Sequence, residues 1–172
     1  MENVKIVKAT SADADQLQKI ASETFIEAFS AVNTEENMKH YLEQNLSLTK
    51  LTEEINNQGS TFYFAVFEDT TIGYLKINTG KAQTELKDDL ALEIERIYVM
   101  KAYYGKGVAN MLYDQAIETA FEINANYVWL GVWEENPRAI SFYTKNGFVP
   151  FDKHIFKLGS DVQTDIMMKK NL

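Results

Sequence analysis

From residue 90 to residue 156 the sequence alternates between short β-branched runs and stretches with the spacing of amphipathic helices. We predict strands at Leu90–Val99 and Tyr127–Trp133, each followed by a helix, at Gly107–Ile123 and Asn136–Asn146. Two strands joined through a helix belong to one sheet, and the helix covers a face of that sheet. This segment therefore predicts an α/β fold.

The rest of the chain adds strands and helices around this segment. Residues 61–77 are rich in aromatic and β-branched residues and are split by the polar stretch Glu68–Thr71, which is typical of a β-hairpin. No repeat or flexible linker divides the sequence, so we predict a single domain over residues 1–172, built on a mixed sheet with helices packed on its faces. The remaining predicted elements are strands at Val4–Ala9, Thr61–Phe67, Ile72–Ile77, Phe148–Phe156 and Gln163–Met168, and helices from Thr10 to about Phe29, from Thr34 onward and over about Thr49–Asn57.

The chain has no cysteine, which excludes a disulfide framework, a thiolate zinc site, an iron–sulfur cluster and a cysteine nucleophile. Its two histidines, His40 and His154, are too isolated in the sequence to predict a metal site or a Ser-His-Asp triad. We therefore expect no metal, and we expect both histidines to be ordinary surface or packing residues.

The charge of the chain bears on its partners. The formal net charge is −8, from 17 Lys and Arg against 25 Asp and Glu. Such a surface repels phosphate polymers and attracts cations, so we expect no nucleic-acid partner, although the same acidity could serve solubility alone. The apolar runs are short and the N-terminal stretch Met1–Lys5 carries mixed charge, so we expect no membrane span, no signal peptide and a cytoplasmic location.

A glycine-rich turn follows the strand Leu90–Val99. Gly105 and Gly107 allow backbone N–H groups to gather at the start of the next helix, where free donors and the positive end of the helix dipole suit a pyrophosphate. A Gly-x-Gly sequence by itself is also common in tight turns that bind nothing, and neither the dinucleotide fingerprint nor the P-loop pattern is present.

The segment Asn136–Phe148 specifies a short helix clearly. Asn136 is a good N-cap, Pro137 fits the first helical position and Gly147 is a natural stop. Asn136 and Tyr143 are seven residues apart, so they fall on one face and could both face one extended ligand. The alternative is a capped helix with an interfacial tyrosine.

Together these two segments resemble the GCN5-related N-acetyltransferase (GNAT) family, whose acetyl-CoA signature is [QR]-x-x-G-x-[GA] after the fourth strand and N-x-x-A-x-x-F-Y-x-x-x-G-F after the fifth. The matching stretches are Tyr104–Ala109 and Asn136–Phe148. The resemblance implies the GNAT fold, with a mixed, mostly antiparallel sheet of six to seven strands and helices on both faces, and acetyl-CoA as the donor. Tyr104 stands where the family usually has Gln or Arg, which removes a side-chain contact to the phosphates but leaves the backbone donors.

The resemblance also implies which residues hold the cofactor. The strand edge would meet the pantetheine, the glycine-rich turn would meet the pyrophosphate, and nearby lysines would either meet a phosphate or remain solvated. The implied residues are Ile97 and Val99 at the edge, Tyr104, Gly105, Lys106, Gly107, Val108 and Ala109 in the turn, and Asn136, Tyr143 and Lys145 on the second helix.

Within the family, Glu35–Leu42, Leu92–Tyr98 and Trp129–Glu134 look most similar to the bacterial PaiA branch, whose members acetylate polyamines such as spermidine and spermine. That likeness implies a small cationic amine as the acceptor. Several acids on the early helices and the fourth strand are candidate ammonium partners, although helix-dipole and surface roles explain the helical ones equally well. These candidates are Glu27, Glu35, Glu36 and Glu93.

The acceptor amine has to be neutral to attack a thioester. A lysine-like amine has a pKa of about 10.4, so its deprotonation at pH 7 costs roughly 4.6 kcal/mol, and a base or a water relay is required. Glu95 is our first candidate, because strand alternation puts it on the face of Ile97 and Val99 and the family's spermidine/spermine acetyltransferases carry Glu at the matching position. The alternative is that Glu95 only pairs with Arg96 or a nearby lysine. Glu93, on the same face as Glu95, is the second candidate.

The family usually places a tyrosine beside the leaving sulfur, and Tyr143 occupies that position. Proton transfer from a tyrosine (pKa about 10) to a thiolate (about 8.5) is uphill by roughly 2 kcal/mol, so hydrogen-bond stabilisation is the expected role. We expect direct transfer in a ternary complex. Two alternatives remain open: another acceptor, such as a protein N-terminus or an aminoglycoside, or an acetyl-CoA-binding regulator without turnover. The oligomeric state stays open between a monomer and a homodimer.

Overall fold

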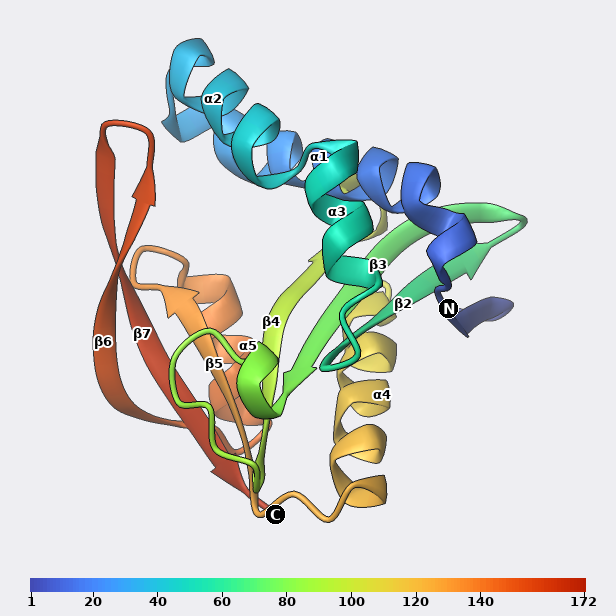
Figure 1. Cartoon of the computed structure of the whole chain (residues 1–172), viewed down its shortest axis with the longest axis vertical. Coiled ribbons are helices and arrows are strands. Elements are labelled where there is room, and N and C mark those ends of the chain that lie inside the picture. The colour runs from blue at the N-terminus through green and yellow to red at the C-terminus, as the bar shows by residue number, and fades with distance from the viewer.

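The computed structural model describes residues 1–172 and contains one seven-stranded sheet with the order β1-β2-β3-β4-β5-β7-β6 (Figure 1). Every neighbouring pair is antiparallel except β4 and β5, which are parallel. The predicted mixed, mostly antiparallel sheet of an α/β fold is confirmed. The strands are β1 Val4–Lys8, β2 Ser60–Phe67, β3 Thr70–Thr79, β4 Ala91–Val99, β5 Tyr127–Trp133, β6 Val149–Leu158 and β7 Asp161–Asn171.

The helices begin where the sequence places capping residues. Thr34 Oγ1 accepts a hydrogen bond from the backbone N–H of Asn37, and Asn136 Oδ1 accepts one from Ala139 at 3.1 Å, so both predicted caps are confirmed. The α-helices are α1 Ala14–Phe29, α2 Glu35–Asn45, α3 Leu48–Ile55, α4 Val108–Glu122 and α5 Pro137–Lys145, and the short 3-10 turns are η1 Ser11–Asp13, η2 Ser30–Val32, η3 Gly80–Ala82 and η4 Lys101–Tyr103.

The hairpin of β2 and β3 is tighter than the predicted four-residue turn. Glu68 and Asp69 both have positive φ, 46° and 62°, which gives a two-residue turn whose twist matches that of the strands. Phe67 therefore pairs directly with Thr70, and β3 begins two residues earlier than predicted.

Two hydrophobic cores lie on opposite faces of the sheet. One packs under α4 and α5, and it contains the predicted ridge of α4, Val108, Leu112, Ala116 and Ala120, all of which are buried. The other packs under α1, α2 and α3 around Leu17, Leu51 and Phe62. Each face of the sheet is thus covered by its own set of helices.

The two parallel strands separate along their length. β4 pairs with β5 only from Ala91 opposite Tyr127 to Glu93 opposite Trp129. Beyond Glu93 they diverge, and in Figure 1 β5 leans away from β4 toward the β6–β7 hairpin. The second half of β4 therefore keeps a strand partner only on the β3 side. None of the helices has both the length and the apolar character needed to cross a membrane.

Candidate active site

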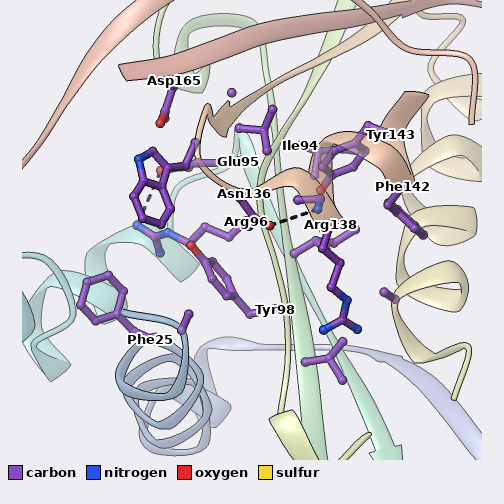
Figure 2. Close-up of a pocket in the computed structure, with 18 of the residues that line it drawn as sticks. Phe25, Ile94, Glu95, Arg96, Tyr98, Asn136, Arg138, Phe142, Tyr143 and Asp165 are labelled. Carbon is purple, nitrogen blue, oxygen red and sulfur yellow. Dashed lines mark hydrogen bonds and ion pairs between the residues drawn. The ribbon is translucent and has the colours of Figure 1, made fainter. Parts of the chain in front are cut away.

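The gap between β4 and β5 is the mouth of a cleft of about 860 Å³. Figure 2 shows Tyr143, Phe142 and Arg138 of α5 on one side of it, and Glu95, Arg96 and Asp165 on the other. The α5 side continues to the glycine-rich turn and the start of α4, and the opposite side continues to residues of α1, α2, β6 and β7. One end of the cleft is thus formed by the glycine-rich turn and the start of α4, and the other by side chains of α1, α2, β6 and β7.

The free edge of β4 presents backbone groups to the cleft. Met100 donates its N–H to the carbonyl of Ile72 at 2.8 Å, so this residue bonds toward β3. Hydrogen-bonded and non-hydrogen-bonded pairs alternate along an antiparallel ladder, so the N–H and C=O groups of Ile97 and Val99 point away from β3. Both residues line the cleft, with these groups directed to its open side.

The start of α4 is shaped by two glycines. Gly105 and Gly107 have φ of 75° and 82°, and a Cβ built on either would meet no atom within 4 Å. Gly107 is the N-cap and has no capping side chain, so the first N–H groups of α4, on Val108 and Ala109, have no partner within the helix. Free donors at the positive end of a helix dipole, beside open space, are suited to a phosphate group.

The helix α5 turns one face to the cleft. Asn136, Ala139 and Tyr143 all line it, as their spacing predicts. Asn136 uses its side-chain oxygen to cap the helix. Tyr143 packs against Phe142 and Phe148, and burial raises the pKa of its hydroxyl well above the usual range. The hydroxyl therefore stays protonated at neutral pH and is available as a hydrogen-bond donor.

The cation at the mouth of the cleft was not among our predicted site residues. The guanidinium of Arg138 lies 4.0 Å from the ring centroid of Tyr104, and both residues line the cleft. Neither Lys106 nor Lys145 lines it, and the Nζ of Lys106 lies over the ring of Tyr103 instead. The position of Arg138 in the first turn of α5, next to Ala139, is the sequence signal that could have identified it.

A β-bulge in β4 changes the orientation of Glu95. Lys76 of β3 pairs with Arg96, whereas Ile77 pairs with Ile94, so Glu95 is an extra residue on β4. The alternation of side chains between the two faces is interrupted at this point. A prediction from simple alternation therefore fails from Glu95 onward.

The bulge puts Glu95 on the face covered by α1, α2 and α3. Its Oε2 is 2.5 Å from the Nζ of Lys76, which is 3.1 Å from Glu54 of α3. Ile97 and Val99 pack into the other core, under α4. Our prediction that Glu95 shares a face with Ile97 and Val99 is wrong, because simple alternation does not allow for the extra residue.

Glu95 belongs to a buried cluster of two carboxylates, Glu54 and Glu95, and two cations, Lys76 and Arg96. Arg96 Nη1 is 2.8 Å from Glu54 Oε2, Arg96 Nη2 is 3.6 Å from Glu95 Oε1, and Asn78 donates to Glu95 Oε2 at 2.7 Å. Burial by itself would raise the pKa of Glu95, but Arg96 and Lys76 hold that pKa below its usual range. The carboxylate is paired in the way that the alternative interpretation anticipates.

The other predicted acids differ in where they lie. Glu93 is buried on the cleft wall, and the side-chain amide of Asn78 donates hydrogen bonds to both Glu93 and Glu95. Glu93 also accepts hydrogen bonds from the backbone N–H and the hydroxyl of Thr84, and burial raises its pKa. Glu27 reaches the cleft but accepts a hydrogen bond from the backbone N–H of Lys101 at 2.7 Å. Glu35 and Glu36 are exposed in the first turn of α2 and do not line the cleft, so the structure does not bring these two predicted ammonium partners to it.

The end of the cleft opposite α4 is an aromatic chamber with acids in its wall. Phe25 of α1 stacks on Tyr41 of α2 with ring centroids 4.3 Å apart, and Phe29, Trp133 and Phe156 pack around them. We call these five aromatic residues the aromatic chamber. Its wall also contains Glu85, His154 and Asp165, which were not predicted site residues. They come from a loop, β6 and β7, so no local sequence motif links them. No group of three or more histidine, aspartate or glutamate side chains in the chain is arranged to hold a metal ion.

Comparisons with known proteins agree with the fold. Residues 15–148 match the family described as the acetyltransferase (GNAT) family. The chain is 40% identical, over its full length and 99% of the relative, to an uncharacterized N-acetyltransferase in the pepI 3′ region of Lactobacillus delbrueckii subsp. lactis. It is 27% identical, over 85% of the chain and 88% of the relative, to a spermidine N(1)-acetyltransferase of Thermoplasma acidophilum. Its fold is similar to a solved PaiA N-acetyltransferase of the same organism in complex with coenzyme A, with a TM-score of 0.80 and 24% identity over 98% of this chain and 99% of that one.

Proposed function

Because the chain belongs to the acetyltransferase (GNAT) family and is an acetyl-CoA-dependent N-acetyltransferase, we propose that its acceptor is a small polycationic amine such as spermidine or spermine. One observation carries the proposal: the aromatic chamber, with Glu85 and Asp165 in its wall, lies across the cleft from the free N–H donors of α4. Aromatic faces and carboxylates both attract an ammonium group. The spermidine acetyltransferase of T. acidophilum and the net charge of −8 support the same class of acceptor.

The other end of the cleft fits acetyl-CoA by its chemistry. The turn Tyr104–Ala109 offers free N–H donors and open space for the pyrophosphate, and Arg138 adds a positive charge beside it. The free backbone groups of Ile97 and Val99 would bond the amides of the pantetheine arm, as an added strand does at a sheet edge. Bound in this way, acetyl-CoA supplies an activated thioester.

Replacing Gly107 by Ala is expected to weaken coenzyme A binding by about five- to thirtyfold. The left-handed φ of 82° costs an alanine about 1–2 kcal/mol, and relief of that strain would turn the N–H donors away from the phosphate. Isothermal titration calorimetry with coenzyme A measures the effect. Gly147→Ala is the matched control: its φ of 90° gives a similar strain, but it does not line the cleft. If both variants bind coenzyme A like the wild type, the turn is not the pyrophosphate site.

The chain's own groups have two tasks in the transfer. The aromatic chamber orients the amine and excludes water from it, and Tyr143 donates a hydrogen bond to the leaving sulfur as negative charge develops there. The chain has no cysteine to form an acyl-enzyme. We therefore infer direct transfer with both substrates bound, which predicts intersecting rather than parallel double-reciprocal plots.

An amine panel tests the acceptor. With free-thiol release as the readout, we expect kcat/KM for spermidine or spermine to exceed that for a monoamine of similar length by about tenfold or more. The second ammonium of a polyamine would meet Glu85, and a charge-assisted hydrogen bond contributes roughly 1.5–3 kcal/mol. The monoamine is the matched control, since it keeps the reacting group and the aliphatic chain.

The same panel separates the alternatives. Acetylation of a peptide N-terminus or an aminoglycoside in preference to polyamines would replace the proposed acceptor and leave the enzyme class intact. Tight acetyl-CoA binding without transfer to any amine would favour a regulator that senses acetyl-CoA.

A further inference from the structure

The proposed acceptor arrives as an ammonium ion and has to lose a proton before its nitrogen can attack. Glu95 is poorly suited to take that proton, because Lys76, Arg96 and Asn78 already occupy its carboxylate oxygens. A proton on Glu95 would also break these contacts and leave two cations of the cluster short of a partner. The cleft must therefore offer another group if a side chain performs this step.

Asp165 is the more buried of the two carboxylates in the chamber wall. It lies on β7 opposite Trp133 of β5, with 16% of its side chain exposed, and Figure 2 shows it on the same side of the cleft as Glu95. Its one close polar partner is His154, whose Nε2 lies 3.2 Å from Oδ2. A carboxylate accepts several hydrogen bonds, so Asp165 keeps free positions for an ammonium.

Gly131 makes the room that this pair occupies. A Cβ built on Gly131 would lie 3.0 Å from Cε1 of His154 and 3.5 Å from Oδ2 of Asp165. Any larger side chain at this position would therefore have to displace the imidazole.

His154 lies between two carboxylates. Its Nε2 faces Asp165, and its Nδ1 is 3.1 Å from an oxygen of Glu85, yet Nδ1 is buried and has no hydrogen-bond partner. A neutral imidazole carries one proton, so one of its nitrogens always turns a lone pair toward a carboxylate oxygen. One added proton fills that position, and both nitrogens can then donate to a carboxylate oxygen.

We propose that Asp165 binds the acceptor ammonium and that the Asp165–His154 pair takes its proton. This inference rests on the proposed function. The N–H bond of the ammonium breaks and the nitrogen keeps the electron pair, while the proton moves through Asp165 to the vacant position on His154. The overall transfer breaks the C–S bond of the thioester and forms the C–N bond of the amide. Of the two protons that the ammonium loses, one goes to the sulfur and the other leaves to solvent past the more exposed Glu85.

Charged and titratable groups face the pair from several elements. Glu85 faces it from the loop before β4 and Tyr41 faces it from α2, while β5 contributes Gly131 and Trp133, neither of which titrates. On β4, Glu95 and Arg96 are paired within their own cluster. Burial raises the pKa of Asp165, His154 opposes that rise and Glu85 adds to it.

The test compares Asp165→Asn and His154→Gln with the wild type, using the best amine of the panel. We expect kcat/KM for the amine at pH 7 to fall about tenfold or more in both variants, and the acid limb of its pH profile to shift or disappear. His154→Gln keeps the Asp165 carboxylate, so it separates loss of the proton position from loss of ammonium binding. The control is Glu134→Gln, which removes an exposed ion pair with Lys153 outside the cleft.

A binding measurement gives a readout independent of turnover. Calorimetric titration of the amine into the protein, in buffers of different ionisation enthalpy, counts the protons exchanged on binding. We expect that count to change in His154→Gln. The affinity for coenzyme A and the thermal midpoint of this variant should stay near the wild-type values. A wild-type pH profile and proton count in both variants would overturn the inference. If the wild type acetylates no polyamine, the proposed function fails instead, whatever the variants do.

Discussion

Replacing Tyr143 by Phe is expected to lower kcat about 100-fold while the KM for acetyl-CoA changes less than about threefold. The substitution removes only the hydroxyl and keeps the ring against Phe142 and Phe148. Loss of one preorganised donor to a developing negative charge typically costs 10² to 10³ in rate, because the charge forms where water cannot replace the donor. Steady-state kinetics at saturating amine, with thiol release as the readout, measures both constants.

Tyr113→Phe is the matched control for this variant. Tyr113 contacts the same Phe142 and Phe148 rings, but its hydroxyl accepts a hydrogen bond from Lys170 and the residue does not line the cleft. Its loss should leave kcat near the wild-type value. If Tyr143→Phe retains full turnover as well, the leaving sulfur does not depend on Tyr143.

Replacing Lys76 by Met is expected to lower the free energy of unfolding by about 3 kcal/mol or more. The Lys76 side chain is 7% exposed and its Nζ contacts both Glu95 and Glu54. Methionine fills a similar volume but leaves two buried carboxylates with Arg96 as their remaining cation, and breaking a buried ion pair in this way costs about 3–5 kcal/mol. Urea unfolding followed by circular dichroism measures the loss, which at an m-value of about 2 kcal/mol/M lowers the midpoint by about 1.5 M.

The control for Lys76 is a lysine in an exposed pair. Lys39 and Glu43 are one helical turn apart on α2 at 3.9 Å, with side chains 78% and 60% exposed, so Lys39→Met should change stability by no more than about 0.5 kcal/mol. Equal effects of the two substitutions would show that burial of the cluster contributes nothing to stability.

The cluster also predicts a dependence on pH. Because the pKa of Glu95 is lower in the folded chain than its ordinary value, its stabilisation is present above the unfolded pKa of about 4.5 and is lost as pH falls through the folded pKa. The wild type should therefore lose its stability advantage over Lys76→Met as the pH falls below about 4.5.

Local patterns were sufficient for most of the secondary structure and for the conformation of the glycine-rich turn before α4. The buried ridge of α4, the Asn136 cap and the positive φ of Gly105 and Gly107 follow from neighbours within a few residues, since helix periodicity, capping and glycine conformation are local properties. The same short segments carry the resemblance to the GNAT family. Strand lengths were less accurate, because the hairpin at Glu68 and Asp69 depends on turn geometry that few residues specify.

The tertiary structure alone decided the end of the cleft opposite α4. The bulge at Glu95 depends on the register between β3 and β4, and no pattern within β4 shows where an extra residue falls. His154 meets Asp165 because β6 pairs with β7, and it meets Glu85 because a distant loop folds over it. The sequence by itself determined most of the secondary-structure elements, the glycine-rich turn and the family. The location of the buried charges depended on contacts between residues far apart in the chain. These contacts gain their energy only when the sheet assembles and removes the charged groups from water.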